Sequence, residues 1–133
     1  MGKKYTGAAV ALLVAVAAPA FAQQPTWRAS SKAGEQRAFI DTSSIQRSGD
    51  MVRFTREISL GEVRVFGSER IDRIGAVIEA NCAARTLRML EVYAKLGDRE
   101  IARGADDGDA EAAAPGSTAD ADLRAACFNE WAR

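Results

Sequence analysis

The 133-residue sequence contains no histidine, and this absence removes several classes of enzyme chemistry at once. Without histidine there is no serine or cysteine triad of the usual kind, no imidazole general base and no imidazole metal ligand. The sequence also lacks a G-x-S-x-G motif, a phosphate-binding glycine loop, a zinc-ligand spacing and a C-x-x-C motif. We therefore expect a protein that is not an enzyme, with no catalytic residues, no cofactor and no bound metal.

One enzymatic alternative survives these absences. Two carboxylates can perform acid-base chemistry without histidine, as in a small carboxylate-dependent hydrolase, but nothing singles out two of the 18 acidic residues. The acidic run at residues 106–111 offers the oxygen ligands that calcium takes, yet it lacks the spacing of an EF-hand loop. An exposed, solvated loop is the simpler interpretation of this run.

Cysteine is scarce, since the sequence holds only Cys82 and Cys127. Neither residue has the neighbouring ligands of a structural zinc site. Two cysteines allow a single intramolecular pairing, and we expect the disulfide to form if the chain is exported. The bridge closes a loop of 46 residues counting both ends, for which chain entropy gives a stabilisation of about 4 kcal/mol.

No apolar run is long enough to span a membrane, which takes about 20 residues. The longest run covers residues 8–18, follows two lysines and precedes an Ala-Phe-Ala sequence. This order predicts that residues 1–22 are a secretory signal peptide cleaved after Ala22. No cysteine lies near the cleavage site, so we expect no lipid anchor. The mature chain, residues 23–133, is predicted to be exported to the periplasm or the cell surface, without a stable membrane span.

An excess of positive charge is also absent, because 18 basic residues balance 18 acidic ones. Removal of residues 1–22 leaves 16 basic and 18 acidic side chains, which does not favour a nucleic-acid partner. Arginine supplies 14 of the 18 positive charges and binds anionic groups well. However, Arg53, Arg56 and Glu57 lie close together on a predicted strand, an interleaving typical of a solvated sheet face.

Alternation of apolar and polar residues predicts a strand-rich body. Residues 51–60 give the clearest pattern, with Val52 and Phe54 on one face and Arg53 opposite. Only Arg56 interrupts the alternation, and a polar second face indicates an antiparallel sheet with one side in water. Further strands are predicted at residues 27–31, 37–40, 74–82 and 85–96.

The segments between these strands also carry signals. Residues 41–44 predict a turn held by side-chain hydrogen bonds to the backbone. Val65 and Phe66 lie in a less regular stretch and are expected to be covered. Residues 104–116 are rich in Asp, Ala and Gly, and they predict an exposed loop.

A C-terminal helix is predicted over residues 117–131, with Ser117 as its N-cap. An apolar stripe recurs every four residues, at Ala119, Leu123, Cys127 and Trp131. Because Cys82 lies on the apolar face of its strand, we expect the helix to lie across the sheet, tied to it by the disulfide.

Aromatic residues are few, and two interpretations of them are open. They form either a ligand-stacking set or the packing of a small sheet protein, of which packing is the simpler. The residues concerned are Trp27, Phe39, Phe54, Phe66, Tyr93, Phe128 and Trp131.

Four features in order resemble the surface-adhesin protein E family of small exported bacterial proteins. They are Trp27, the segment 39–49 (FIDTSSIQRSG), Asn81-Cys82 followed by Arg85, and Pro115-Gly116-Ser117 before the helix that holds Cys127. The resemblance implies an antiparallel sheet of about six strands, with a C-terminal helix held on its concave side by a disulfide. It also implies a surface-adhesin protein E-like domain over residues 23–133 with an adhesive role.

We therefore expect an α+β fold and a non-enzymatic binding protein of the bacterial cell envelope that acts through protein-protein contacts. A periplasmic structural or assembly factor is the alternative. The expected partner is an extracellular or envelope protein, reached by strand addition at an open sheet edge, and the same edge offers a route to a homodimer.

Overall fold

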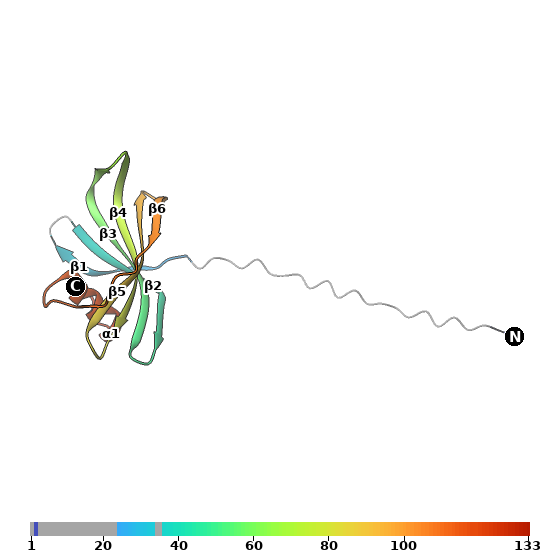
Figure 1. The fold of residues 1–133 in the computed structure, drawn as a ribbon, viewed down its shortest axis with the longest axis vertical. Helices are drawn as coiled ribbons and strands as arrows, with labels where there is room; N and C mark the ends of the chain where they lie inside the picture. The colour runs from blue at the N-terminus through green and yellow to red at the C-terminus, as the bar shows by residue number, and fades with distance from the viewer. Residues whose placement is uncertain (1, 3–23, 34–35) are drawn as a thin grey trace.

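The computed structural model describes residue 2, residues 24–33 and residues 36–133. Apart from Gly2, the predicted signal peptide lies outside the described residues. The described part of the chain forms seven strands and one helix (Figure 1). In chain order these are β1 (Trp27–Ala33), β2 (Gln36–Ser48), β3 (Met51–Phe66), β4 (Glu69–Asn81), β5 (Thr86–Leu96), β6 (Arg99–Ala105), β7 (Glu111–Ala112) and α1 (Thr118–Phe128).

Strands β1 to β6 lie side by side in the order of the sequence, and each neighbouring pair is antiparallel. Three of the tight turns between them start with a glycine at positive φ, at Gly49 (58°), Gly67 (63°) and Gly97 (59°). Glycine adopts this conformation without strain, as two-residue hairpin turns require. The short β7 pairs with the start of β5. The predicted antiparallel sheet of about six strands with a C-terminal helix is confirmed.

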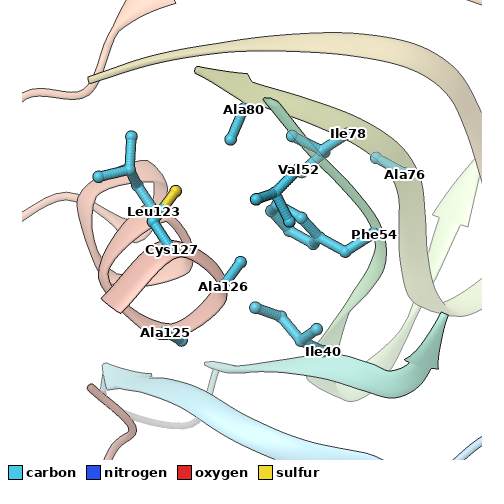
Figure 2. Packing of buried hydrophobic residues seen from close by; sticks show 10 residues of the cluster. All are labelled: Ile40, Val52, Phe54, Ala76, Ile78, Ala80, Leu123, Ala125, Ala126 and Cys127. Atoms are coloured by element: carbon cyan, nitrogen blue, oxygen red, sulfur yellow. The ribbon is translucent and has the colours of Figure 1, made fainter. Parts of the chain in front are cut away.

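The sheet curves around α1, which lies against one of its faces (Figure 2). We call this the helix face and the opposite side the outer face. The core between sheet and helix contains Ile40, Val52, Phe54, Ala76, Ile78, Ala80, Leu123, Ala125, Ala126 and Cys127. Residues two apart in β3 and β4 reach this core because side chains alternate between the two faces of a strand. Cys82, directly after β4, is bonded to Cys127 with the Cα atoms 5.6 Å apart, which confirms the predicted disulfide.

Both ends of α1 are capped. The Ser117 side chain accepts a hydrogen bond from the backbone N–H of Asp120 at 3.1 Å, which satisfies one of the free donors of the first turn. The helix ends at Phe128, three residues before the predicted end, because Asn129 adopts the left-handed conformation (φ 57°). Trp131 therefore reaches the edge of the core from the tail that follows the helix.

The hydrogen bonds predicted for residues 41–44 form, but inside a strand. The pairing of β2 with β3 shifts register between Asp41 and Gln46. In this irregular segment, side chains form hydrogen bonds with the nearby backbone. The Asp41 carboxylate accepts from the backbone N–H of Ser43 at 3.0 Å and from that of Thr26 at 2.9 Å. The second bond ties the segment before β1 to β2.

The expectation that Val65 and Phe66 are covered is wrong. Val65 and Phe66 are 74% and 76% exposed, because β3 and β4 continue past α1 as a hairpin whose end nothing in the described chain covers. The predicted loop at 104–116 is interrupted, because β6 runs to Ala105 and β7 pairs with β5. Its sequence lacks apolar periodicity because these residues are almost all exposed.

Candidate binding surfaces

A buried ion pair fixes the helix on the sheet. Arg56 of β3 lies on the helix face, and its Nη1 donates to Asp122 Oδ2 of α1 at 2.9 Å. The Ser30 hydroxyl donates to the other Asp122 oxygen at 2.9 Å. Burial raises the pKa of the Asp122 carboxyl above its ordinary value, while Arg56 and the Ser30 hydroxyl act in the opposite direction. Both carboxylate oxygens are thus satisfied, but by only two donors.

Two further arginines bind the ends of α1. Arg85 Nη2 lies 3.2 Å from Asp120 Oδ1 in the first turn. At the other end, Arg47 Nη2 donates to the carbonyl oxygen of Cys127 at 2.7 Å, where a cation is favoured by the helix dipole. Together with the disulfide, these contacts hold α1 in one position on the sheet. A surface that can bind a partner is therefore expected on the parts of the sheet that α1 does not cover.

The first such surface is an apolar groove on the part of the helix face that α1 does not cover. Cross-strand pairing places Ile74, Ala94 and Ala102 in one row on this face. Val92 and Gly104 pair in the next row, and Phe66 stands at the border. These residues line a groove of about 410 Å³, which we call the β6 groove. Ile74 and Phe66 are 42% and 76% exposed, so apolar surface is available to a partner.

The β6 groove lies beside the open edge of the sheet. Strand β6 pairs only with β5 in the described chain. The backbone N–H and C=O groups along its other edge are therefore available for hydrogen bonds. The edge at β1 differs, because the backbone N–H of Ala132 in the C-terminal tail donates to the carbonyl of Ala29 at 3.3 Å. An incoming strand therefore meets a free edge at β6 and a partly covered one at β1.

The outer face holds a buried carboxylate that the sequence pattern predicted to be exposed to solvent. Glu57 was expected on the solvated face, but it is only 3% exposed. Its Oε2 accepts from the Tyr93 hydroxyl at 2.7 Å and from Lys95 Nζ at 3.1 Å. The neighbouring Arg73 guanidinium is 3.7 Å from Oε1. The alternation predicted the correct face for Glu57 and missed the side chains that cover it.

Tyr93 reaches Glu57 across a strand because Gly75 lies between them. Glu57 pairs with Gly75, and Gly75 pairs with Tyr93. A Cβ atom at position 75 would overlap the Tyr93 ring, so only glycine lets the ring lie flat over β4. Burial and then the hydrogen bond to Glu57 raise the pKa of Tyr93, against the effect of Arg103, whose guanidinium lies 4.4 Å from the ring centre.

The acidic run at residues 106–111 does not gather around one point. Asp106 accepts a hydrogen bond from the backbone N–H of Gly108 at 2.8 Å within the run itself. In the part of the chain that the structure describes, no three acidic or cysteine side chains are placed to hold a metal ion. A cavity of about 300 Å³ separates this run from α1, with Arg56 and Asp122 among its lining residues.

These features define a small disulfide-linked α+β domain whose meander sheet is closed by a helix on one face and open at one edge. The sequence profile of the surface-adhesin protein E family matches residues 27–128, and the chain belongs to that family. No curated protein sequence matches it. In residue 2, residues 24–33 and residues 36–133, no helix is long and apolar enough to cross a membrane.

Solved structures of Haemophilus influenzae protein E have the same fold. One, crystal form II, superposes with a TM-score of 0.56 at 14% identity and covers 80% of this chain and 98% of its own. Another, from non-typeable H. influenzae, gives 0.58 at 17% identity and covers 84% of this chain and 82% of its own. At such identities the likeness concerns the path of the backbone.

Sequence reasoning missed the ion pair, although a signal for it is present. Arg56 breaks the alternation of its strand because it occupies an apolar position, and Asp122 lies next to Leu123 on the apolar stripe of the helix. Opposite charges at core positions of two elements indicate a buried pair. No comparable signal marks the β6 groove, since it depends on how far the hairpin of β3 and β4 extends past α1.

Proposed function

We propose that this protein is an exported, non-enzymatic binding protein of the cell envelope that acts through protein-protein contacts at the β6 edge. In this proposal residues 1–22 direct export and are removed, and residues 23–133 are the binding domain. Family membership supports an adhesin-like role in general terms. The position of the binding surface rests on the structure alone.

The observation that carries the proposal is the open β6 edge with the β6 groove next to it. Strand addition uses backbone hydrogen bonds for affinity and adjacent pockets for every second side chain. On the groove side of β6, Ala102 has only a methyl group and Gly104 has no side chain, which lets an added strand place larger side chains there. Phe66 supplies an exposed aromatic group, a residue type enriched at binding interfaces.

Charges on β6 limit which strands can be added. Arg103 contacts Glu100 on the same strand and Glu91 on β5, at 3.0 Å for the second pair. Charged side chains on an edge disfavour indiscriminate pairing. We therefore expect a partner segment with a matching charge pattern, so an unspecific apolar strand should bind poorly.

The proposal is tested by site-specific photocrosslinking in intact cells. A photoreactive residue at Ala102 should give a discrete adduct with an envelope or extracellular protein, whereas the same residue at Ala84, in the exposed turn before β5, should not. The substitution Phe66→Ser should reduce the Ala102 adduct without changing the melting temperature. Equal labelling at both positions, or no effect of Phe66→Ser, would contradict the β6 edge as the binding surface.

Protease treatment of the same intact cells shows in which compartment binding takes place. Protease added outside should digest a protein displayed at the surface and spare one held in the periplasm. If the adduct at Ala102 forms only in the protease-resistant fraction, the protein works as a periplasmic assembly factor through the same edge. An adduct in the protease-accessible fraction supports an adhesin-like role.

A further inference from the structure

The outer face carries a second concave site, separate from the β6 groove. A cavity of about 250 Å³ is lined by Trp27, Phe39, Glu57, Ser59 and Arg73, and we call it the outer-face pocket. Its residues come from β1, β2, β3 and β4. Phe39 pairs with Glu57, and Ser59 pairs with Arg73, so the polar groups lie in two adjacent rows of the sheet.

Glu57 contributes a carboxylate oxygen that accepts no hydrogen bond from a described residue. The side chain is 4% exposed, and the hydroxyl of Tyr93 and the ammonium of Lys95 both donate to Oε2. The other oxygen, Oε1, has only Arg73 Nη1 at 3.7 Å, which is too long for a hydrogen bond. Oε1 is not among the enclosed side-chain atoms that lack a partner in the described chain, so it can accept a hydrogen bond from a group in the pocket that it lines.

Arg73 and Ser59 offer complementary groups beside that oxygen. The Arg73 side chain is 40% exposed, and its guanidinium has only donors, whereas Oε1 of Glu57 only accepts. The Ser59 hydroxyl can do either. A group that fits this set must donate and accept at neighbouring positions, as two adjacent hydroxyls of a polyol do.

The charged groups around the pocket disfavour a ligand that is itself charged. Glu57 is already within reach of two cations, Arg73 and Lys95, so a further cation is disfavoured. An anionic group can be held by Arg73, but it brings no donor for Oε1 of Glu57 and is repelled by that carboxylate. A neutral group with hydroxyls at its edge and C–H bonds on its face meets neither obstacle.

The geometry points to a binding site for one neutral pyranose ring of a glycan in the outer-face pocket. Pockets for drug-sized ligands measure about 300–1,000 Å³, so a cavity of about 250 Å³ admits a single ring. The C–H face of the sugar packs against Trp27 and Phe39, and adjacent hydroxyls donate to Glu57 and accept from Arg73. Tyr93, lying across Gly75, holds the carboxylate in place before the sugar arrives.

The test is nuclear magnetic resonance on the exported, disulfide-bonded protein with glucose, galactose, N-acetylglucosamine and its trimer as probes. Glucosamine and glucuronate serve as a cation and an anion built on the same ring as glucose. We expect at least one neutral sugar to shift the indole N–H resonance of Trp27 and leave that of Trp131 unchanged. The two charged sugars should bind more weakly than glucose.

Substitutions locate the site. Trp27→Ala and Glu57→Gln should each weaken sugar binding by about tenfold, and Arg73→Gln provides a variant at a more exposed position if Glu57→Gln does not fold. Glu91→Gln is the matched control, because Glu91 is exposed and, among the described residues, forms an ion pair only with Arg103. It should bind sugar as the parent protein does.

Three outcomes would overturn the inference: no neutral sugar binds, a charged sugar binds as well as glucose, or Trp27→Ala binds with the parent affinity. Crosslinking of a protein to the pocket in place of a sugar would do so too. The test is independent of the β6 edge, since Ala102→Glu in the β6 groove should leave sugar binding unchanged.

Discussion

At the scale of single residues, the buried pair of Arg56 and Asp122 shows how a charge in the core fixes one arrangement. Side-chain exposures of 9% and 0% mean that both groups have left water. A buried pair adds little net stability compared with apolar residues of the same size, but removal of one partner leaves an uncompensated charge. The pair therefore specifies the position of α1 more than it contributes to the free energy of unfolding.

We predict that Asp122→Ala lowers the free energy of unfolding by about 3–5 kcal/mol, because Arg56 stays buried without its counterion. Urea unfolding measures the effect. Glu130→Ala, which removes an exposed partner of Arg124, is the control and should change stability by less than about 1 kcal/mol. Replacing both partners, Arg56→Met with Asp122→Leu, should recover most of the loss. A loss for Asp122→Ala no larger than that of the control would show that Arg56 is hydrated.

Tyr93 is the only tyrosine in residues 23–133, which makes its ionisation directly measurable. Its pKa is raised by burial and by the hydrogen bond to Glu57, while a tyrosine in an unfolded chain ionises near pH 10. The folded state then binds more protons than the unfolded one above about pH 10, so stability is complete below that pH and falls above it. Ultraviolet absorbance should show no tyrosinate near pH 10 while the protein is folded.

Glu57→Gln tests the cause of this shift. The amide removes the negative charge next to the phenol, so the pKa of Tyr93 should move back toward its ordinary value. Unchanged titration in this variant would assign the shift to burial alone. Gly75→Ala should also expose Tyr93, because the added methyl group occupies the place of the ring.

The placement of Glu57 and Tyr93 shows what a residue pattern cannot predict. Alternation along residues 51–60 assigned Glu57 to the outer face correctly. Its burial depends on Tyr93, which lies 36 positions further along the chain and reaches it only because Gly75 has no side chain. The burial of Glu57 by Tyr93 depends on the pairing register of β3, β4 and β5. The periodicity within one strand contains no information about that register.

At the scale of elements, α1 was largely predictable because its signals are local. Ser117 caps it, and Leu123 and Cys127 face the sheet as the four-residue spacing predicted. The spacing wrongly included Trp131 in the helix, since a stripe does not reveal the left-handed turn at Asn129. The exposed end of the β3 and β4 hairpin was missed because Val65 and Phe66 are typical of buried strands.

A helix of 11 residues is too short to be stable by itself, so its contacts with the sheet decide whether it forms. We predict that Cys127→Ser lowers the free energy of unfolding by about 2–5 kcal/mol, the usual effect of losing a native disulfide in a small secreted domain. Thermal unfolding followed by circular dichroism measures it. Leu123→Ala, with the disulfide intact, should cost about 2–5 kcal/mol through the cavity left by a fully buried side chain. If neither substitution moved the midpoint, α1 would not be docked in solution.

At the scale of the whole molecule, the fold combines a small core with one covalent link. The family relationship extends over most of the described chain, whereas identity to the protein E structures is 14–17%. A shared backbone path at that identity requires only the alternation of the strands, the glycine turns and a helix across the sheet. This is why the fold could be predicted from the sequence, while the β6 groove and the outer-face pocket, which depend on particular side chains, could not.

The disulfide between Cys82 and Cys127 makes the stability of the fold depend on the compartment, because this bond persists only under oxidising conditions. A small domain has a net stability of about 5–15 kcal/mol, of which a disulfide closing a loop of this length supplies about 4 kcal/mol. We therefore predict that exported protein begins at Gln23 and contains no free thiol, as intact mass measurement with and without alkylation would show. Chain made without residues 1–22 and kept in a reducing cytoplasm should be alkylated at both cysteines and should unfold at a lower temperature. Retention of residues 1–22 in the exported protein would contradict the predicted cleavage. Equal stability of the reduced and oxidised chains would contradict the stabilising role of the disulfide.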